Sequence, residues 1–378
     1  MIKFCRYLSV FLCLSFSAEA ELFKAHEFFL DNGLHCVVIE NHKAPIVKHM
    51  LWYKVGSVDE NNGRGGSAHL LEHLMFRGTK KVSGEKFNEI MEQYGADSNA
   101  FTSHDMTVYH QFADISKLEL LMALEADRMQ NLDFDENDFA GEQKIVLQER
   151  KQVIENNPAS PFTERLNKML WPNSAYGHPV TGLSTEIMSL TYANVTDFYH
   201  KYYAPNNAIL IVSGDINFEL AKQLIEKYYG NIERKAVVRT ALNVDDNYFA
   251  ETLDMALPNI TASQMVQKWL LSPHNKLQEK IFDYVVLAQY LGGGETSALY
   301  KQLVLEQNNA VSISAAYKFA TSGNTVFSVS LVPAVHTKQY TKQLWKDLYA
   351  AMEKSMKNLT AAKLEQIKRK ILADLVYV

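Results

Sequence analysis

The sequence has little cysteine, no strong excess of one charge and no apolar run long enough to cross a membrane. Its 378 residues include three cysteines, of which Cys5 and Cys13 lie near the N-terminus and Cys36 stands alone. A single cysteine cannot form an intramolecular disulfide, so stability must come from a packed core. The net charge of −5 gives no electrostatic reason to expect nucleic acid as a partner. Neither nucleic-acid binding nor stable membrane insertion is therefore expected.

The N-terminal segment differs from the rest of the chain. Lys3 and Arg6 precede the apolar run 8–16, and the segment 18–20, Ala-Glu-Ala, has the small residues of a signal-peptidase site. The apolar run is well short of the ~20 residues that a spanning helix needs, which favours cleavage over a retained anchor. We therefore expect residues 1–20 to be a signal peptide and the protein to be exported, into the periplasm if the source is a Gram-negative bacterium.

Length and composition favour two domains. The chain exceeds one average domain, and 47% hydrophobic with 21% charged residues is ordinary globular composition. The stretch 232–246 lacks clear periodicity and is the best candidate for a boundary. We predict an N-terminal domain over 21–234 and a C-terminal domain over 235–378. The last expected helix has no terminal cap or tail, so we expect the second domain to be incomplete at its C-terminus.

Strand and helix patterns are mixed along the chain. Asn32-Gly33 supplies the positive φ angles of a tight hairpin between two short strands. Further strands are expected at 46–58, 98–103, 106–113, 209–213, 265–271, 311–320 and 325–331, and helices at 86–94, 115–129, 135–156, 218–229, 277–291 and 361–378. Because strands and helices do not alternate strictly, an α+β fold with antiparallel sheet is favoured.

The stretch 68–76, AHLLEHLMF, is an apolar helix pattern that carries two histidines and a glutamate. Ser67 is expected to cap this helix. Positions i, i+3 and i+4 share one face, so His69, Glu72 and His73 project together. Burying three polar groups costs several kcal/mol unless they have partners, and a metal ion bound by both imidazoles would supply one. The H-x-x-E-H pattern is the reversed form of a zinc-protease signature.

A third ligand is required, and two glutamates are candidates. Glu142 and Glu149 lie seven residues apart on an expected helix, about two turns, so they share one face of it. Either could complete the site. Taken alone, such a pair is more typical of a solvated helix face.

These motifs make the chain resemble the pitrilysin and insulinase family of zinc metallopeptidases, which includes the mitochondrial processing peptidase and small bacterial zinc proteases. The resemblance covers nearly all of the mature chain. It rests on HLLEH at 69–73, NAFTSHDMTVY at 99–109, GEQKIVLQER at 141–150, YGHPVTG at 176–182 and YAPNNAILIVSGD at 203–215. The motifs HLLEH and GEQKIVLQER together are highly specific for this family.

The resemblance implies a role for each residue of the constellation. His69, His73 and Glu149 match the family's ligands for one Zn²⁺ per chain, and Glu72 matches its general base. Glu142 matches an additional acidic residue that supports the site without binding zinc. Three protein ligands leave a fourth position for water, as in catalytic zinc sites.

The resemblance also implies a place for the substrate. Asn99 and Ala100 match an edge strand beside the metal, where a peptide adds itself as an extended strand, although from the residues alone an ordinary sheet strand is favoured. Strand addition uses backbone hydrogen bonds and tolerates many sequences. The implied architecture is two related α+β domains, each an antiparallel-rich sheet packed with helices, that face each other across a chamber and accept peptides or unfolded polypeptide.

The second domain departs from the family pattern. Active members often present an arginine and a tyrosine there, and the corresponding positions here are Gln307 and Val311. Some bacterial relatives divide the work between two subunits, and this chain resembles the zinc-bearing one. We therefore expect a zinc endopeptidase acting with a homologous partner subunit or as a homodimer. A self-sufficient peptidase and a non-catalytic peptide-binding or scaffold protein are the alternatives.

One glycine-rich turn suggests a different chemistry. Gly292-Gly293-Gly294 could form a phosphate loop, but no lysine follows at the spacing that such a loop requires. The turn resembles instead the one that opens a helix of the second domain in the same family. A phosphate site is not expected from the sequence.

Overall fold

The computed structural model describes residues 24–239, 250–273, 280–321 and 323–376. These form two compact units, residues 21–242 (the first unit) and 243–378 (the second unit). The sequence-based boundary, after residue 234, precedes this division by a few residues. The predicted signal peptide and part of the predicted boundary stretch lie outside the described residues. Among the described residues, no helix has both the length and the apolar character needed to span a bilayer.

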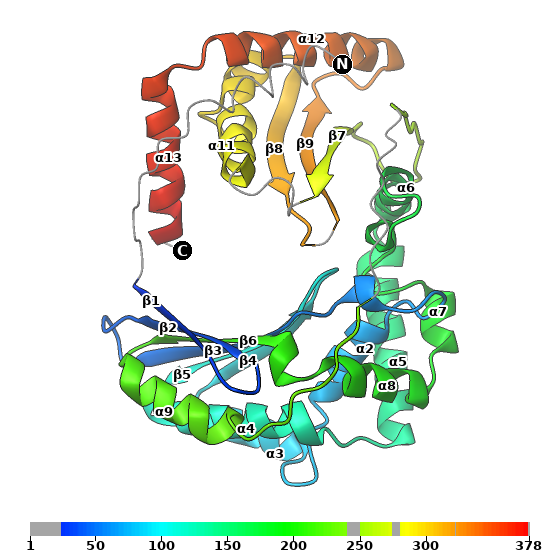
Figure 1. Ribbon diagram of the computed structural model, residues 1–378. Coiled ribbons are helices and arrows are strands. Elements are labelled where there is room, and N and C mark those ends of the chain that lie inside the picture. Colours follow the sequence, from blue (N-terminus) through cyan, green and yellow to red (C-terminus); the bar gives the residue numbers. More distant parts are fainter. Residues whose placement is uncertain (1–23, 240–249, 274–279, 322, 377–378) are drawn as a thin grey trace. The chain divides into compact units, whose positions relative to one another are not determined.

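A six-stranded sheet organises the first unit (Figure 1). In spatial order its strands are β1 (Ala25–Phe29), β2 (His35–Glu40), β6 (Ala208–Gly214), β3 (Ile46–Tyr53), β5 (Thr107–Asp114) and β4 (Asp97–Thr102). All neighbouring pairs are antiparallel except β2 and β6. Along β6, buried and half-buried residues alternate, as expected for a strand with one face packed on a core. The position of β4 at the end of the sheet leaves one of its edges without a strand partner in the described part of the unit.

The helices of the first unit include several that periodicity did not predict. They are α2 (Ser67–Met75), α3 (Gly84–Gln93), α4 (Leu118–Asn131), α5 (Glu136–Glu149), α6 (Ser160–Leu170), α7 (Ser184–Ser189), α8 (Tyr192–Tyr202) and α9 (Phe218–Tyr229), with a π-helical segment, η4 (Arg150–Glu155), continuing α5. Helices α4 and α9 cover one face of the sheet (Figure 1). Helix α7 is only six residues long and α8 is rich in aromatic and β-branched residues, so their intrinsic helix propensity is weak and packing decides their structure.

The start of α2 corrects one sequence-based prediction. Ser67 is not the cap; Gly66, at φ 90°, precedes the helix, and Ser67 is its first residue. The hydroxyl of Ser67 donates to the Arg64 carbonyl at 2.7 Å. The backbone amides of Gly66 and Ala68 donate to the Glu60 carboxylate at 3.1 and 2.8 Å. A buried carboxylate from the preceding loop therefore supplies the capping that a serine side chain was expected to supply.

The second unit repeats the order of elements in one part of the first unit, from β3 to α5. Its elements are β7 (Met265–Pro273), α11 (Lys280–Gly292), η7 (Tyr300–Glu306), β8 (Ala310–Lys318), β9 (Asn324–Pro333), α12 (Lys338–Lys357) and α13 (Ala361–Val376). The three strands lie in the order β7-β9-β8 and are antiparallel. This is the arrangement of β3-β5-β4 in the first unit. Helix α11 follows β7 as α2 follows β3. Helices α12 and α13 follow β9 as α4 and α5 follow β5.

The repeat makes the two units structurally related, and it confirms the predicted α+β class with antiparallel-rich sheets. In the first unit α2 packs against α5, and in the second unit α11 packs against α13. Each unit has its own apolar core, built in the second around residues such as Leu291, Leu348 and Phe327. Helix α12, which periodicity did not predict, buries Leu348 and Met352 in that core.

Candidate metal centre

Two helices of the first unit bring together two histidines and one glutamate. Successive turns of α2 present His69 and His73, whose rings are 4.9 Å apart, and α5 ends with Glu149. The Glu149 carboxylate lies 3.3 Å from Nε2 of His73 and 3.8 Å from Nε2 of His69. Three candidate ligand atoms lie within 4.8 Å of one another, and the described residues contain no other such group of three.

This donor set fits a zinc ion. Bonds of about 2.0–2.2 Å from a tetrahedral Zn²⁺ place two ligand atoms about 3.3 Å apart, close to the separations between Glu149 and the two imidazoles. The remaining residues of α2 around the site, such as Leu70 and Leu74, are fully buried, so the helix is held by apolar packing on its other faces. The geometry can hold one metal ion with a coordination position left for water.

The electrostatics of His69 favour a neutral imidazole. Burial, and then the neighbouring His73, lower the pKa of His69 to about 4, while Glu149 opposes that shift. A histidine binds a metal through its neutral form, so burial prepares His69 for this role. Its Nδ1 atom is buried and has no hydrogen-bond partner within the described residues.

Glu142 lies behind His73 and outside the cluster of ligand atoms. One of its oxygens is 3.1 Å from Nδ1 of His73, and the other is 2.6 Å from Nη2 of Arg77. The hydrogen bond from His73, followed by the charge of Arg77, holds the pKa of Glu142 below its ordinary value although burial opposes that shift. Burial would lower the pKa of His73, but the hydrogen bond and charge of Glu142 outweigh it and raise that pKa.

Of the two glutamates that the sequence left open, Glu149 therefore lies among the candidate ligand atoms and Glu142 orients a histidine. A carboxylate that accepts from the far nitrogen of a metal-binding histidine fixes its tautomer and ring orientation. Arg77 was not singled out from the sequence. Arg77 lies in the turn that follows α2, and it reaches the same carboxylate as His73 from there.

Glu72 lies beside the cluster and is nearly buried. Its carboxylate accepts a short hydrogen bond from the hydroxyl of Thr102, the last residue of β4. Burial raises the pKa of Glu72, and the hydrogen bond from Thr102 opposes that rise. A carboxylate whose pKa is raised towards neutrality is suited to accept and return a proton. The sequence analysis missed Thr102, although it belongs to the motif NAFTSHDMTVY.

The predicted substrate strand is an edge strand that ends at this glutamate. Asn99 and Ala100 lie in β4, which pairs with β5 on one side only. The side-chain oxygen of Asn99 accepts from the backbone amide of Ala100 at 2.8 Å, so this amide is directed away from β5. The strand can therefore offer backbone groups to an added peptide, and the role of Asn99 and Ala100 stays a prediction.

The end of α5 is anchored by the residue that follows Glu149. Arg150, the first residue of the π-helical segment, is buried and bonds the Glu164 carboxylate at 2.8 Å and the Thr181 hydroxyl at 3.2 Å. π-Helical turns occur frequently at functional sites. Here the turn begins directly after a candidate metal ligand, and the anchored arginine fixes the position of that ligand.

Two family patterns match almost the whole described chain. Residues 36–183 match the pattern described as insulinase (peptidase family M16), and residues 189–371 match the one described as peptidase M16 inactive domain. The chain belongs to peptidase family M16. The resemblance to the pitrilysin and insulinase family is thereby confirmed.

M16 relatives are similar over most of the chain. The zinc protease PqqE of Helicobacter pylori is 28% identical over 375 residues, which are 98% of this chain and 83% of that protein. The beta subunit of the mitochondrial-processing peptidase of Rattus norvegicus is 30% identical over 53% of this chain and 41% of that protein. The crystal structure of a protease from H. pylori has a TM-score of 0.79 at 26% identity and covers 94% of this chain and 85% of that one.

The M16 inactive-domain pattern begins at residue 189, in the first unit, and extends to residue 371, near the end of the second unit. There Gln307 directly follows η7, and Val311 lies in β8 with a largely exposed side chain. Neither side chain carries the charge of an arginine or the phenol of a tyrosine. The departure noted in the sequence therefore lies within the pattern that is described as inactive.

Proposed function

We propose that this protein is a zinc-dependent endopeptidase that hydrolyses peptides or unfolded polypeptide segments. One observation carries the proposal: His69, His73 and Glu149 converge with ligand-like separations beside the buried Glu72. Relatives named as zinc proteases support it.

Each residue of the centre has a chemical task in this proposal. A zinc ion held by His69, His73 and Glu149 would supply Lewis acidity towards a water molecule and the carbonyl of the scissile bond. Glu72 takes the proton of the attacking water and returns it to the amine of the leaving group. Glu142 accepts the hydrogen of His73 Nδ1, which leaves Nε2 free to act as a ligand.

The substrate would bind by its backbone. A peptide added along β4 runs towards Thr102 and therefore towards Glu72, which Thr102 contacts. Ala100 would contribute main-chain hydrogen bonds to this added strand, and the Asn99 side chain, which accepts from the Ala100 amide, would release that amide. Recognition of the backbone predicts a broad tolerance for side chains and a requirement for extended, unfolded segments.

A partner and an exported location complete the proposal. Gln307 and Val311 stand where active members of the family often have an arginine and a tyrosine, so a homologous partner subunit or a second copy of this chain would supply those groups. One relative is named as a subunit, which supports an assembly. The charged and apolar pattern of residues 1–20 supports export.

The test is zinc content and cleavage of a quenched peptide library, with the wild type beside Glu72→Gln and the control Glu136→Gln. Glu136 lies in the exposed first turn of α5. We expect zinc in all three proteins and a loss of at least about a hundredfold in cleavage with Glu72→Gln alone, a common magnitude for a general base. Repeating the assay with the homologous partner tests the assembly.

A non-catalytic peptide-binding protein is the second candidate, favoured by Gln307 and Val311. Zinc binding without cleavage, alone or with the partner, would support this candidate and reject the endopeptidase. Absence of zinc from the wild type would reject the proposed metal centre, both for the endopeptidase and for a zinc-binding protein without catalysis.

A further inference from the structure

The second unit carries two lysines, Lys363 and Lys370, on one face of its last helix, α13. Helices α2 and α5 correspond in element order to α11 and α13, and each pair is packed together. Glu142 and Glu149 lie seven residues apart on α5. Lys363 and Lys370 lie seven residues apart on α13, with the buried Ile367 on the same face between them. The face of α13 that packs towards α11 therefore carries two positive charges.

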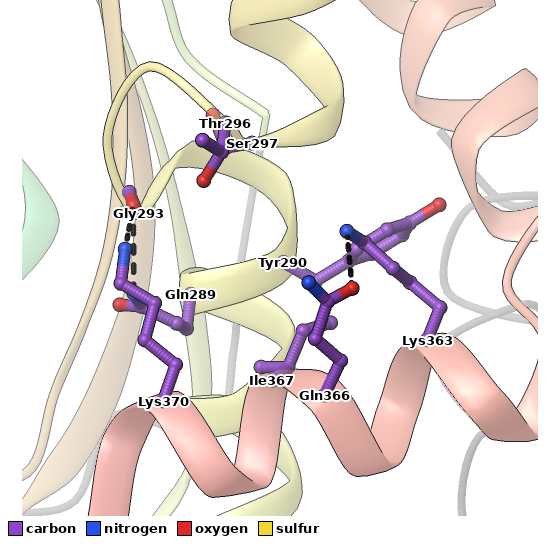
Figure 2. A pocket seen from close by; sticks show the side chains of 9 residues that line it. All are labelled: Gln289, Tyr290, Gly293, Thr296, Ser297, Lys363, Gln366, Ile367 and Lys370. Atoms are coloured by element: carbon purple, nitrogen blue, oxygen red, sulfur yellow. Dashed lines mark hydrogen bonds between the residues drawn. The ribbon is translucent and has the colours of Figure 1, made fainter. Parts of the chain in front are cut away.

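These lysines border a cavity. It has a volume of about 70 Å³ and is lined by α11, α13 and the turn that follows Gly293. About 10–15 Å³ on the same measure is enough for one water molecule, so the cavity has room for a small polyatomic ion. Figure 2 shows Lys363 and Lys370 on α13, with Thr296 and Ser297 of the turn across the cavity from that helix.

Neither lysine is neutralised within the described residues. The ammonium of Lys370 donates to the Gly293 carbonyl at 3.2 Å, and that of Lys363 donates to the side-chain oxygen of Gln366 at 3.0 Å. No ion pair with a described carboxylate involves either of them. Both lysines line the same cavity, and each ammonium has three donor hydrogens, so each can donate further bonds to an anion bound there.

A buried hydroxyl gives an independent indication of a ligand. Ser297 is only 5% exposed, and its Oγ atom has no hydrogen-bond partner among the described residues. Buried polar side chains nearly always have a partner, so each exception needs an explanation. Ser297 is one of the residues that line the cavity that the lysines border (Figure 2).

We propose that this cavity binds a small oxyanion of the phosphate class. Lys363 and Lys370 supply charge from α13, and Ser297 donates a hydrogen bond from the opposite wall. Lysines act as point charges towards phosphate oxygens, and a tetrahedral anion can accept from several directions at once. The site would differ from a phosphate loop, because its lysines come from α13, far along the chain from the glycine turn.

The test is calorimetric titration of the full-length, zinc-loaded chain with inorganic phosphate, at an ionic strength held constant with sodium chloride. We expect saturable binding by the wild type and none by the double variant Lys363→Gln/Lys370→Gln. Ser297→Ala should weaken binding about tenfold, the effect of losing one hydrogen bond to a charged group. The control is Lys368→Gln, which removes the same charge from α13 at a residue that pairs with Glu365; it should bind as the wild type does.

Further titrations distinguish the sources of the anion. Saturation by phosphate and by glycerol phosphate assigns the site to a phosphomonoester group, and saturation by phosphate alone assigns it to the free ion. Equal heats with acetate, or unchanged affinity in both the lysine double variant and Ser297→Ala, would overturn the proposal. Because the cavity shares no residue with the metal centre, Glu72→Gln should bind phosphate normally even if the proposed peptidase activity fails.

Discussion

At the scale of single residues, the metal centre depends on a chain of contacts from Arg77 to Glu142 to His73. We predict that Glu142→Ala lowers zinc affinity about 10- to 100-fold, the usual effect of losing the carboxylate that orients a metal-binding histidine. Competition with a chromogenic chelator measures this. The variant should retain the fold, because Glu142 lies in the interior of α5 and alanine is a strong helix former.

Two matched variants separate the charge of Glu142 from its hydrogen bond. Glu142→Gln keeps an oxygen that can accept from His73 and should lose less affinity than Glu142→Ala. Glu136→Gln, on the exposed first turn of the same helix, should lose none. If Glu142→Ala bound zinc as tightly as the wild type, the proposed support of His73 would be wrong.

A second residue-scale prediction concerns the buried His49. Burial lowers its pKa below the ordinary 6.5, although its interactions with Glu125 and Gln111 oppose the shift. The unfolded chain therefore binds the proton first as the pH falls. Stability from this group is complete above pH 6.5 and decreases below it, by up to about 1.4 kcal/mol per pH unit, until the folded pKa is reached.

Urea unfolding between pH 8 and pH 5 measures this dependence. His49→Gln removes the titrating group and can still bond Gln111 or Tyr229, which contact the two ring nitrogens at 2.8 and 3.0 Å. The variant should lose less stability than the wild type on going from pH 7 to pH 5. An identical pH dependence in both proteins would exclude His49 as its source.

At the scale of elements, the sequence predicted those parts whose pattern is local. The spacing of His69, Glu72 and His73 is enough to place them on one helix face, and the apolar residues between them predict its burial. The cap of α2 was not predictable, because Glu60 reaches it from a loop. Periodicity also could not decide whether Glu142 or Glu149 is the third candidate ligand, since both share a face of α5. That depends on where α2 packs against α5.

Strand β4 gives a prediction of its own. In Ala100→Pro, the backbone amide that points to the free edge disappears, while β4 keeps its bonds to β5, because this amide bonds the Asn99 side chain instead. We expect the KM for extended peptides to rise about two- to tenfold, the effect of one lost hydrogen bond. Ala100→Val adds a similar volume and keeps the amide, so its KM should stay near that of the wild type. Equal kinetics for both variants would contradict strand addition at Ala100.

At the scale of the whole molecule, all candidate ligands come from the first unit. Removing zinc with a chelator should therefore destabilise residues 21–242 and leave the second unit unchanged. The loss is about 3–4 kcal/mol when zinc is present at 100 to 1,000 times its Kd. Hydrogen exchange resolved along the chain measures this, with the greatest loss of protection in α2 and α5.

The matched control is His73→Ala, in which the chelator should change nothing because the ligand set is already broken. If the chelator reduced protection evenly over both units of the wild type, the stabilising effect of the metal would not be confined to the first unit. The comparison also separates the metal centre from the proposed phosphate cavity, whose residues all belong to the second unit.

The positions of the ligands along the chain have a consequence for folding. Two ligands lie in α2 and the third ends α5, and the strands β4 and β5 with helices α3 and α4 are formed by the chain between them. Closing so long a loop has an entropic cost that only the packing of the intervening elements offsets. The three ligands therefore meet only after that part of the sheet has assembled. A zinc ion bound by these ligands would therefore not nucleate the folding of this unit but would stabilise a structure that the apolar core has already built.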